Sequence, residues 1–361
     1  MPRAARSPRA LALIAGVSAL ALLSACSRAG SDTPAPAAAD QGPATEVHLG
    51  YFPNVTHAAA LIGLEKGFFT KELGNTKLST QQYNAGPDEV GALLGKSLDA
   101  AFIGSGPAIN AFSKSNGQGV RLVAGATSGG AQLVVRNGIN SPADLKGKTI
   151  ATPQLANTQD ISLKKWLVAN NLKAGDGPDD VKVTNADNAT TLDLFKKGNI
   201  DAAWAPAPWS SRLVIEGGAK VLVDERTQWP DGRFPTTVLI VRTEFLQQHP
   251  QTVEALIKGE LDAVDYAASN KADAEAAVND QLKKLTGKAL AQNVIDDSWG
   301  QIQLTTDPIA KQFPQLAKDQ VTAGVAKTAP AVQGFADFTL LNKVLQAAGK
   351  PAVDAAGLDQ K

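Results

Sequence analysis

The 361-residue chain carries 35 basic and 35 acidic residues, and its Lys and Arg side chains form no run longer than a pair, which argues against a nucleic-acid-binding stripe. A single cysteine, Cys26, excludes a disulfide framework and a cysteine-based metal site. The three histidines, at 48, 57 and 249, have no metal-ligand spacing, so neither a metal nor a cofactor is expected.

The first 26 residues have the pattern of an export signal. Three arginines precede the apolar stretch Leu11–Leu23, which is too short to span a membrane. It ends in Leu-Ser-Ala-Cys, which resembles a bacterial lipobox, so we expect lipid on Cys26. The alternative is an ordinary signal peptide cut near Ala25. With the lipid, the exported chain is anchored to a membrane, on its periplasmic or cell-surface side.

A flexible tether follows the lipobox. Residues 27–46 are rich in Ala, Pro, Gly and small polar residues and show no apolar period. The folded part is expected to begin near Val47 and to hold about 315 residues, which is large for one hydrophobic core. Two domains or lobes are therefore predicted.

One phrase occurs twice in the chain. LDAAFIGSGPA (Leu98–Ala108) returns as IDAAWAPAPWS (Ile200–Ser210), with Asp99 aligned to Asp201. A strand-loop-helix pattern precedes each copy, in Val47–Phe69 and in Lys148–Leu167. Each half then follows the order β-α-β-α-β, which predicts two α/β lobes, each a mainly parallel sheet flanked by helices. Ligands bind beyond the strand ends of such sheets.

Two apolar strands are expected to cross between the lobes. They are Ala131–Arg136 and Val238–Arg242, and each leads into a turn and a short helix. This interpretation assigns residues 47–135 and 242–361 to lobe 1 and residues 136–241 to lobe 2. The helical periodicity after Gln251 is assigned to lobe 1 as a cap. Two crossing strands make a hinge on which the lobes close around a ligand.

At GYFPNVTHA, GSGPA, ATSGGAQLVVR and TPQLANTQD the sequence resembles the substrate-binding lipoproteins of bacterial ABC importers, closest to the aliphatic sulfonate, taurine and nitrate group. The resemblance extends over Val47–Gly349, including FTLLNKVLQAAGKP. It implies the two-lobed periplasmic-binding-protein fold of type II. It also implies a monomer that captures a small-molecule anion and delivers it to a permease driven by a cytoplasmic ATPase.

Four loops at strand ends are expected to face the cleft between the lobes. Three of them enter helix starts, whose free N–H groups and dipoles bind an anion without Lys or Arg. Each residue has an alternative role as a helix cap or a turn residue. The candidate ligand-binding residues are Asn54, His57, Ser105, Gly106, Ser128, Gly129, Gln154, Asn157, Thr158, Trp209 and Trp229.

Aromatic and charged residues near these loops indicate the ligand's size and charge. Trp209 and Trp229 are expected to give the cleft an apolar wall, which favours an organic tail over bare nitrate. Trp204 aligns with Phe102 at the end of a buried strand and is expected in the core. Asp160 either binds an amine or satisfies the first turn of a helix.

The favoured function is a solute receptor for an aliphatic sulfonate, with nitrate, taurine or a pyrimidine or vitamin precursor as alternatives. No phosphate-loop, dinucleotide, zinc-protease or nucleophile-elbow motif occurs in the chain, so no enzyme is predicted. Two other interpretations stay open: an enzyme on the same two-lobed scaffold, and a sensor or adhesion lipoprotein.

Overall fold

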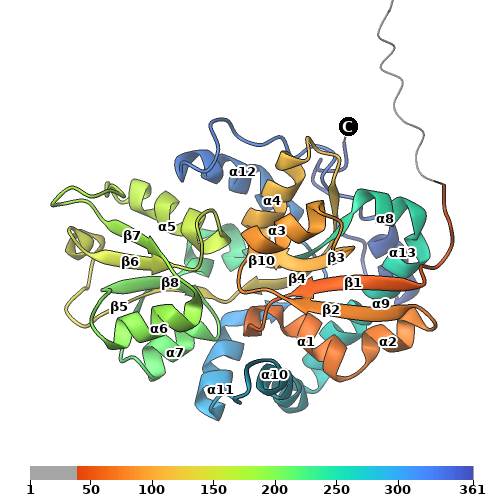
Figure 1. Ribbon diagram of the computed structural model, residues 1–361, viewed down its shortest axis with the longest axis horizontal. Coiled ribbons are helices and arrows are strands. Elements are labelled where there is room, and N and C mark those ends of the chain that lie inside the picture. Colours follow the sequence, from red (N-terminus) through yellow and green to blue (C-terminus); the bar gives the residue numbers. More distant parts are fainter. Residues whose placement is uncertain (1–38, 361) are drawn as a thin grey trace, which may run out of the picture. The chain divides into compact units, whose positions relative to one another are not determined.

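Two separate β-sheets organise residues 39–360, the part of the chain that the computed structural model describes (Figure 1). The predicted signal, the lipobox with Cys26 and most of the tether lie outside the described residues. We call each sheet with its helices a lobe, and the two-lobed α/β architecture expected from the sequence is confirmed.

The first sheet has the strand order β11-β4-β10-β3-β1-β2. Strands β2, β1 and β3 run parallel, whereas β10 pairs antiparallel with both β3 and β4, and β11 pairs antiparallel with β4. The sheet is thus mixed rather than mainly parallel. Its strands are β1 (Glu46–Tyr51), β2 (Lys77–Gln82), β3 (Ala100–Gly104), β4 (Val120–Gly129), β10 (Pro235–Arg242) and β11 (Ile302–Leu304).

Helices of the first lobe come from both ends of the described chain. Helix α9 contacts α1, α2 and α13, and α4 contacts α3 and α12. The helical periodicity expected after Gln251 is confirmed, because the five helices α9 to α13 occupy this part of the chain. The helices are α1 (Ala58–Glu65), α2 (Phe68–Leu73), α3 (Gly86–Leu94), α4 (Ser105–Lys114), α8 (Thr243–Gln248), α9 (Pro250–Ser269), α10 (Lys271–Thr286), α11 (Gln292–Gln301), α12 (Phe313–Thr322) and α13 (Thr339–Ala347), with the 3-10 turns η1 (Val55–His57) and η5 (Ala310–Gln312).

The second sheet has the order β7-β6-β8-β5-β9 and repeats the first in part. Strands β7, β6 and β8 are parallel, and β5 pairs antiparallel with β8 and β9. Its elements are β5 (Ala131–Val135), η2 (Pro142–Leu145), β6 (Thr149–Thr152), α5 (Thr158–Ala169), β7 (Lys182–Asn185), α6 (Asn188–Lys196), β8 (Ala202–Pro206), α7 (Trp209–Ile215), β9 (Lys220–Asp224), η3 (Glu225–Gln228) and η4 (Pro230–Gly232).

The chain passes between the sheets at positions that differ from the expected boundaries near Val135 and Val241. Strand β4 belongs to the first sheet and β5 to the second, so the first passage falls at Gly129–Gly130, where φ is +75° and +86°. The return passage is the segment 225–234, because β10 already lies in the first sheet. Each of the two expected crossing strands therefore pairs within a single sheet, β5 in the second and β10 in the first. Strands buried on both faces show no pattern that reveals which sheet they join.

The repeated phrase forms the same brace in each lobe. The Asp99 carboxylate accepts the backbone N–H of His48 at 2.9 Å, and the Asp201 carboxylate accepts the N–H of Thr149 at 2.9 Å. Each aspartate thereby ties the turn before one parallel strand, β3 or β8, to the start of its neighbour, β1 or β6. The duplication inferred from the sequence is thus also a duplication of hydrogen bonds.

Two arginines complete the brace at the ends of the antiparallel strands. The Arg242 Nε–H donates to the Leu98 carbonyl at 3.0 Å, and the Arg136 Nε–H donates to the Ile200 carbonyl at 2.9 Å. In the first lobe the guanidinium also pairs with Asp99 at 2.7 Å. These contacts lie at the strand ends opposite the site described below and serve the scaffold.

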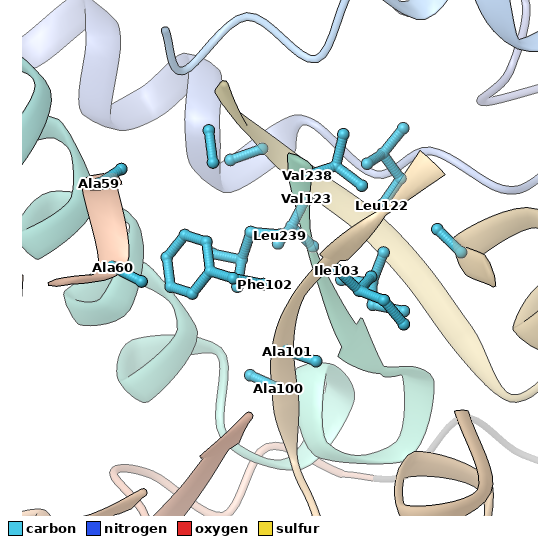
Figure 2. Packing of buried hydrophobic residues seen from close by; sticks show 14 of the residues in the cluster. Ala59, Ala60, Ala100, Ala101, Phe102, Ile103, Leu122, Val123, Val238 and Leu239 are labelled. Carbon is cyan, nitrogen blue, oxygen red and sulfur yellow. The ribbon is translucent and has the colours of Figure 1, made fainter. Parts of the chain in front are cut away.

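The core of the first lobe forms around its central strands. Figure 2 shows Phe102 and Ile103 of β3 beside Val238 and Leu239 of β10, all fully buried. Burial of one such side chain contributes about 1.5–3 kcal/mol. In the second lobe Trp204 packs edge-on against Trp166, which confirms its expected place in the core.

Candidate functional site

A pocket lies where the carboxyl ends of the parallel strands of both lobes meet. The space between its walls is about 360 Å³, part of it open to solvent. We call it the strand-end pocket. It is lined by Phe52, Asn54, Thr56, His57, Asn84, Gly104, Pro107, Pro153, Asn157, Thr158, Gln159, Asn188, Pro206, Thr236 and Thr237.

None of these lining residues carries a formal charge at neutral pH, and most offer hydroxyl, amide or imidazole groups. Helices α4, α5 and α6 begin at the pocket, the first from one lobe and the other two from the second. Helix N-termini carry a partial positive charge and unpaired N–H groups. The pocket is therefore suited to an anion that is held by neutral donors.

His57 supplies a hydrogen-bond donor without a charge. The side chain is fully buried, and this burial lowers the pKa of His57 to about 3, so the ring is neutral. Its Nδ1 accepts the backbone N–H of Phe52 at 3.3 Å, which leaves the proton on Nε2. The centre of the Phe52 ring lies 4.4 Å from the centre of the imidazole, and the two rings are tilted by 35°. His57 thus presents an N–H group at the pocket wall.

Helix α5 brings two predicted residues to the pocket. Asn157 is its N-cap, and its Oδ1 accepts the Gln159 N–H at 3.1 Å, as the sequence predicted for this helix start. The cap leaves the Asn157 amide N–H₂ group as a donor. Thr158 accepts the N–H of Gly106 from the other lobe at 3.3 Å. Nearby, Asn188 has a buried Oδ1 without a hydrogen-bond partner.

Direct contacts join the lobes around the pocket. The Trp209 indole N–H donates to Asn54 Oδ1 at 2.9 Å, and the Gln154 amide donates to Asp88 at 3.0 Å. Lys165 of α5 pairs with Asp319 of α12 at 2.9 Å. The structure is therefore a closed arrangement of the two lobes.

Four of the eleven predicted site residues line the strand-end pocket. Asn54, His57, Asn157 and Thr158 line the strand-end pocket, and Gly106 faces a neighbouring cavity. Ser105 is fully buried at the start of α4, and its hydroxyl has no hydrogen-bond partner.

The remaining candidates do not line the pocket. The Ser128 hydroxyl accepts the N–H of Phe234, and Gly129 forms the first passage between the sheets. Gln154 and Trp209 make the inter-lobe contacts described above.

Trp229 also lies away from the pocket, packed against Phe234 under the Lys165 ammonium. The expected tryptophan wall is therefore wrong for the strand-end pocket. Asp160 is fully buried and paired with Lys164 at 2.8 Å, which is the structural role and not amine binding.

Sequence reasoning missed several residues of the pocket. Asn84 and Asn188 follow β2 and β7, so the strand-end rule applied to these two strands would have found them. Thr236 and Thr237 lie at the start of β10, and nothing in the local pattern distinguishes them from core residues of that strand.

A larger surface cavity of about 1110 Å³ lies in the first lobe, between the loop 305–311 and the segment 345–356. Its three cations are engaged: Arg233 with Asp307, Lys311 with Asp231 and Lys350 with Asp265. It lacks the convergence of helix starts and is not the candidate site.

Of the helices in residues 39–360, none combines the length and apolar composition that crossing a bilayer requires. Among those same residues, no group of three or more His, Cys, Asp or Glu side chains is placed to hold a metal ion.

Comparisons with known proteins identify the family of the chain. The profile of the NMT1-like family matches residues 40–279. The taurine-binding periplasmic protein of Escherichia coli is 31% identical over 198 residues, which are 54% of this chain and 58% of that protein. The chain thus matches less than two thirds of that relative. A putative aliphatic sulfonates-binding protein of Bacillus subtilis is 26% identical over 92% of this chain and 96% of its own length.

Solved structures show the same fold. The periplasmic nitrate-binding protein NrtA of Synechocystis PCC 6803 superposes with a TM-score of 0.69 and 18% identity, over 85% of this chain and 90% of that one.

Proposed function

The chain belongs to the NMT1-like family, and from this membership and the strand-end pocket we propose that it is the solute-binding protein of an ABC importer. The observation that carries the proposal is the meeting of uncharged donors and helix starts from both lobes in one pocket. The ligand is a small organic anion, and the best candidate is a short aliphatic sulfonate. A sulfonate keeps its charge at all physiological pH values and is a weak base, so hydrogen bonds from neutral donors suffice to hold it.

The proposed mechanism is closure on the ligand. The anion bridges donors of both lobes, such as His57 and Asn157, and stabilises the closed arrangement in which Trp209 reaches Asn54. Only a ligand that binds the closed form more tightly can shift this equilibrium. The closed form then docks on the permease, which is coupled to a cytoplasmic ATPase, and the ligand leaves unchanged.

The predicted export signal supports a proposal for the location. We propose that the protein is exported and held at the membrane by lipid on Cys26, and that it acts as a monomer. The substitution Cys26→Ser tests this: the variant is expected in the soluble extracytoplasmic fraction, whereas the parent partitions with membranes. Equal partition of both proteins would reject the anchor.

A thermal-shift panel on the purified protein tests the ligand. It contains short alkanesulfonates, taurine, nitrate, sulfate and a thiamine-precursor pyrimidine. Ligand at 100 times its dissociation constant adds about 2.7 kcal/mol to stability, enough to raise the Tm by several degrees. A shift with sulfonates and none with nitrate supports the proposal. If only nitrate or only the pyrimidine raises the Tm, that compound takes the place of a sulfonate as the proposed ligand. Turnover of any bound compound would reject the receptor function.

A further inference from the structure

A second inter-lobe cavity adjoins the strand-end pocket. The space between its walls is about 250 Å³, part of it open to solvent, and α4, α5, α12 and the return passage contribute to the walls. We call it the side cavity. Its lining residues are Gly106, Thr158, Ile161, Ser162, Trp229, Leu316 and Asp319. Of these, only Thr158 also lines the strand-end pocket.

Thr158 is seated against two glycines of the opposite lobe. A Cβ at Gly104 would lie 2.4 Å from Thr158 Oγ1, and one at Gly106 would lie 3.2 Å from Thr158 Cα. The Gly106 N–H donates to Thr158 Oγ1 at 3.3 Å, which is at the long end of the hydrogen-bond range. The threonine side chain therefore fills the gap left by these glycines and stands between the two spaces.

The side cavity has the character of a site for an uncharged group. Ile161, Leu316 and Trp229 give it apolar walls. The one carboxylate that lines it, Asp319, is paired with Lys165 at 2.9 Å, and the same ammonium lies 4.1 Å from the centre of the Trp229 ring. The charges at its edge thus neutralise each other, and a hydrocarbon tail would meet no unpaired charge there.

We propose that Thr158 sets the length of the ligand by closing the side cavity off from the strand-end pocket. The inference rests on the proposed function and narrows it: the chain takes anions whose tails have one or two carbons. A smaller side chain at position 158 joins the two spaces, and the ligand's tail then extends toward Ile161, Leu316 and Trp229.

Calorimetric titration of three proteins with methane-, ethane-, butane- and hexanesulfonate tests the proposal. The wild type is expected to prefer the two shorter compounds. Thr158→Ala removes the partition. Each fully buried methylene contributes about fourfold in affinity, so the three extra methylenes of butanesulfonate set an upper bound of about sixtyfold, and we expect the ratio of butanesulfonate to methanesulfonate affinity to rise at least about tenfold. Thr158→Val is the matched control, because it keeps the side-chain volume and loses only the hydroxyl.

The outcomes separate the two proposals. An unchanged length preference in Thr158→Val beside a relaxed one in Thr158→Ala supports the partition. Sulfonate binding with the same length preference in all three proteins rejects the role of Thr158 and leaves the proposed function standing. Equal relaxation in both variants assigns the effect to the hydroxyl and also overturns the steric role. No binding by any of the three rejects the sulfonate function, and this inference with it.

Discussion

Adding one methyl group at Gly104 should act as a wedge between the lobes. Gly104 ends β3 with φ −65° and ψ 146°, a conformation that alanine adopts without strain. Its Cβ would lie 2.4 Å from Thr158 Oγ1 of the other lobe, and real Cβ contacts essentially never fall below 3.0 Å. The clash exists only while the lobes are closed, so Gly104→Ala should penalise closure and spare the folding of each lobe.

The free-energy cost of closure in Gly104→Ala depends on how the clash between the new methyl group and Thr158 is relieved. If the Thr158 side chain rotates, its bond from the Gly106 N–H is lost, at a cost of about 1 kcal/mol. If the lobes instead part locally, inter-lobe contacts such as the Trp209 bond to Asn54 weaken in addition. We therefore expect the Kd for the anion that binds the wild type to rise at least about fivefold.

Calorimetry and small-angle scattering check this prediction. Calorimetry measures the Kd, and scattering measures the radius of gyration with and without saturating ligand. Gly91→Ala is the matched control, because Gly91 lies exposed on α3 in the same lobe and a Cβ there meets nothing within 4 Å. The reasoning is refuted if Gly104→Ala binds and compacts like Gly91→Ala.

Of four further predictions, two concern the neutral histidine, one a buried carboxylate and one the Trp209 contact. Because burial lowers the pKa of His57 to about 3, sulfonate affinity should be constant from pH 5 to 8, and titration calorimetry that shows tighter binding as the pH falls through 6.5 would contradict a neutral donor. His57→Ala should raise the Kd at least about tenfold, since a hydrogen bond to a charged group is worth about 1.5–3 kcal/mol. Burial, partly offset by the Ser162 hydroxyl, raises the pKa of Glu225 to about 7 from 4.5, so the folded state binds this proton more tightly than the unfolded chain. The stability that this proton contributes is full below about pH 4.5 and is lost by about pH 7, an effect of about 3 kcal/mol. Glu225→Gln should remove this part of the pH dependence of stability, measured by urea unfolding at several pH values, and an unchanged slope would argue against it. Trp209→Phe removes the bond to Asn54 and should raise the Kd about fivefold without lowering the Tm of the ligand-free protein, whereas an unchanged Kd would show that this contact does not support closure.

The sequence predicted the parts of the site that depend on strand order. Helix α5 begins at Asn157 and Thr158, and both lie at the pocket, because loops after parallel strands meet at one edge of a sheet. The duplicated phrase likewise predicted two lobes. The structure confirms this, and Asp99 and Asp201 make equivalent hydrogen bonds in the two lobes.

Side-chain direction could not be predicted in the same way. Trp209 and Trp229 lie in segments that were expected at the cleft. In the structure the indole of Trp209 contacts Asn54, and that of Trp229 packs against Phe234. Which neighbour an aromatic side chain meets depends on the packing of the two lobes, and this is not contained in local periodicity. The same limit explains the misplaced boundary at Val135, because strand β5 is buried on both faces and its partners β8 and β9 are distant in sequence.

The repeated brace gives the pocket an approximate twofold relation between its walls. In the first sheet Leu49 pairs with Ala100, and in the second Ile150 pairs with Ala202. Counting forward from these pairs, Gly104 of one lobe corresponds to Pro206 of the other, and both line the strand-end pocket. Glycine thus stands in one lobe at the position where the other lobe has a proline ring.

Two identical walls would make the pocket symmetric, and the difference between glycine and proline makes it asymmetric. The proline side fills its own space, whereas the glycine side receives Thr158 from across the cleft. Exchange of residues between such paired positions is therefore a rational route to a receptor with a reshaped ligand preference, because each substitution has a structural precedent in the other half of the same chain.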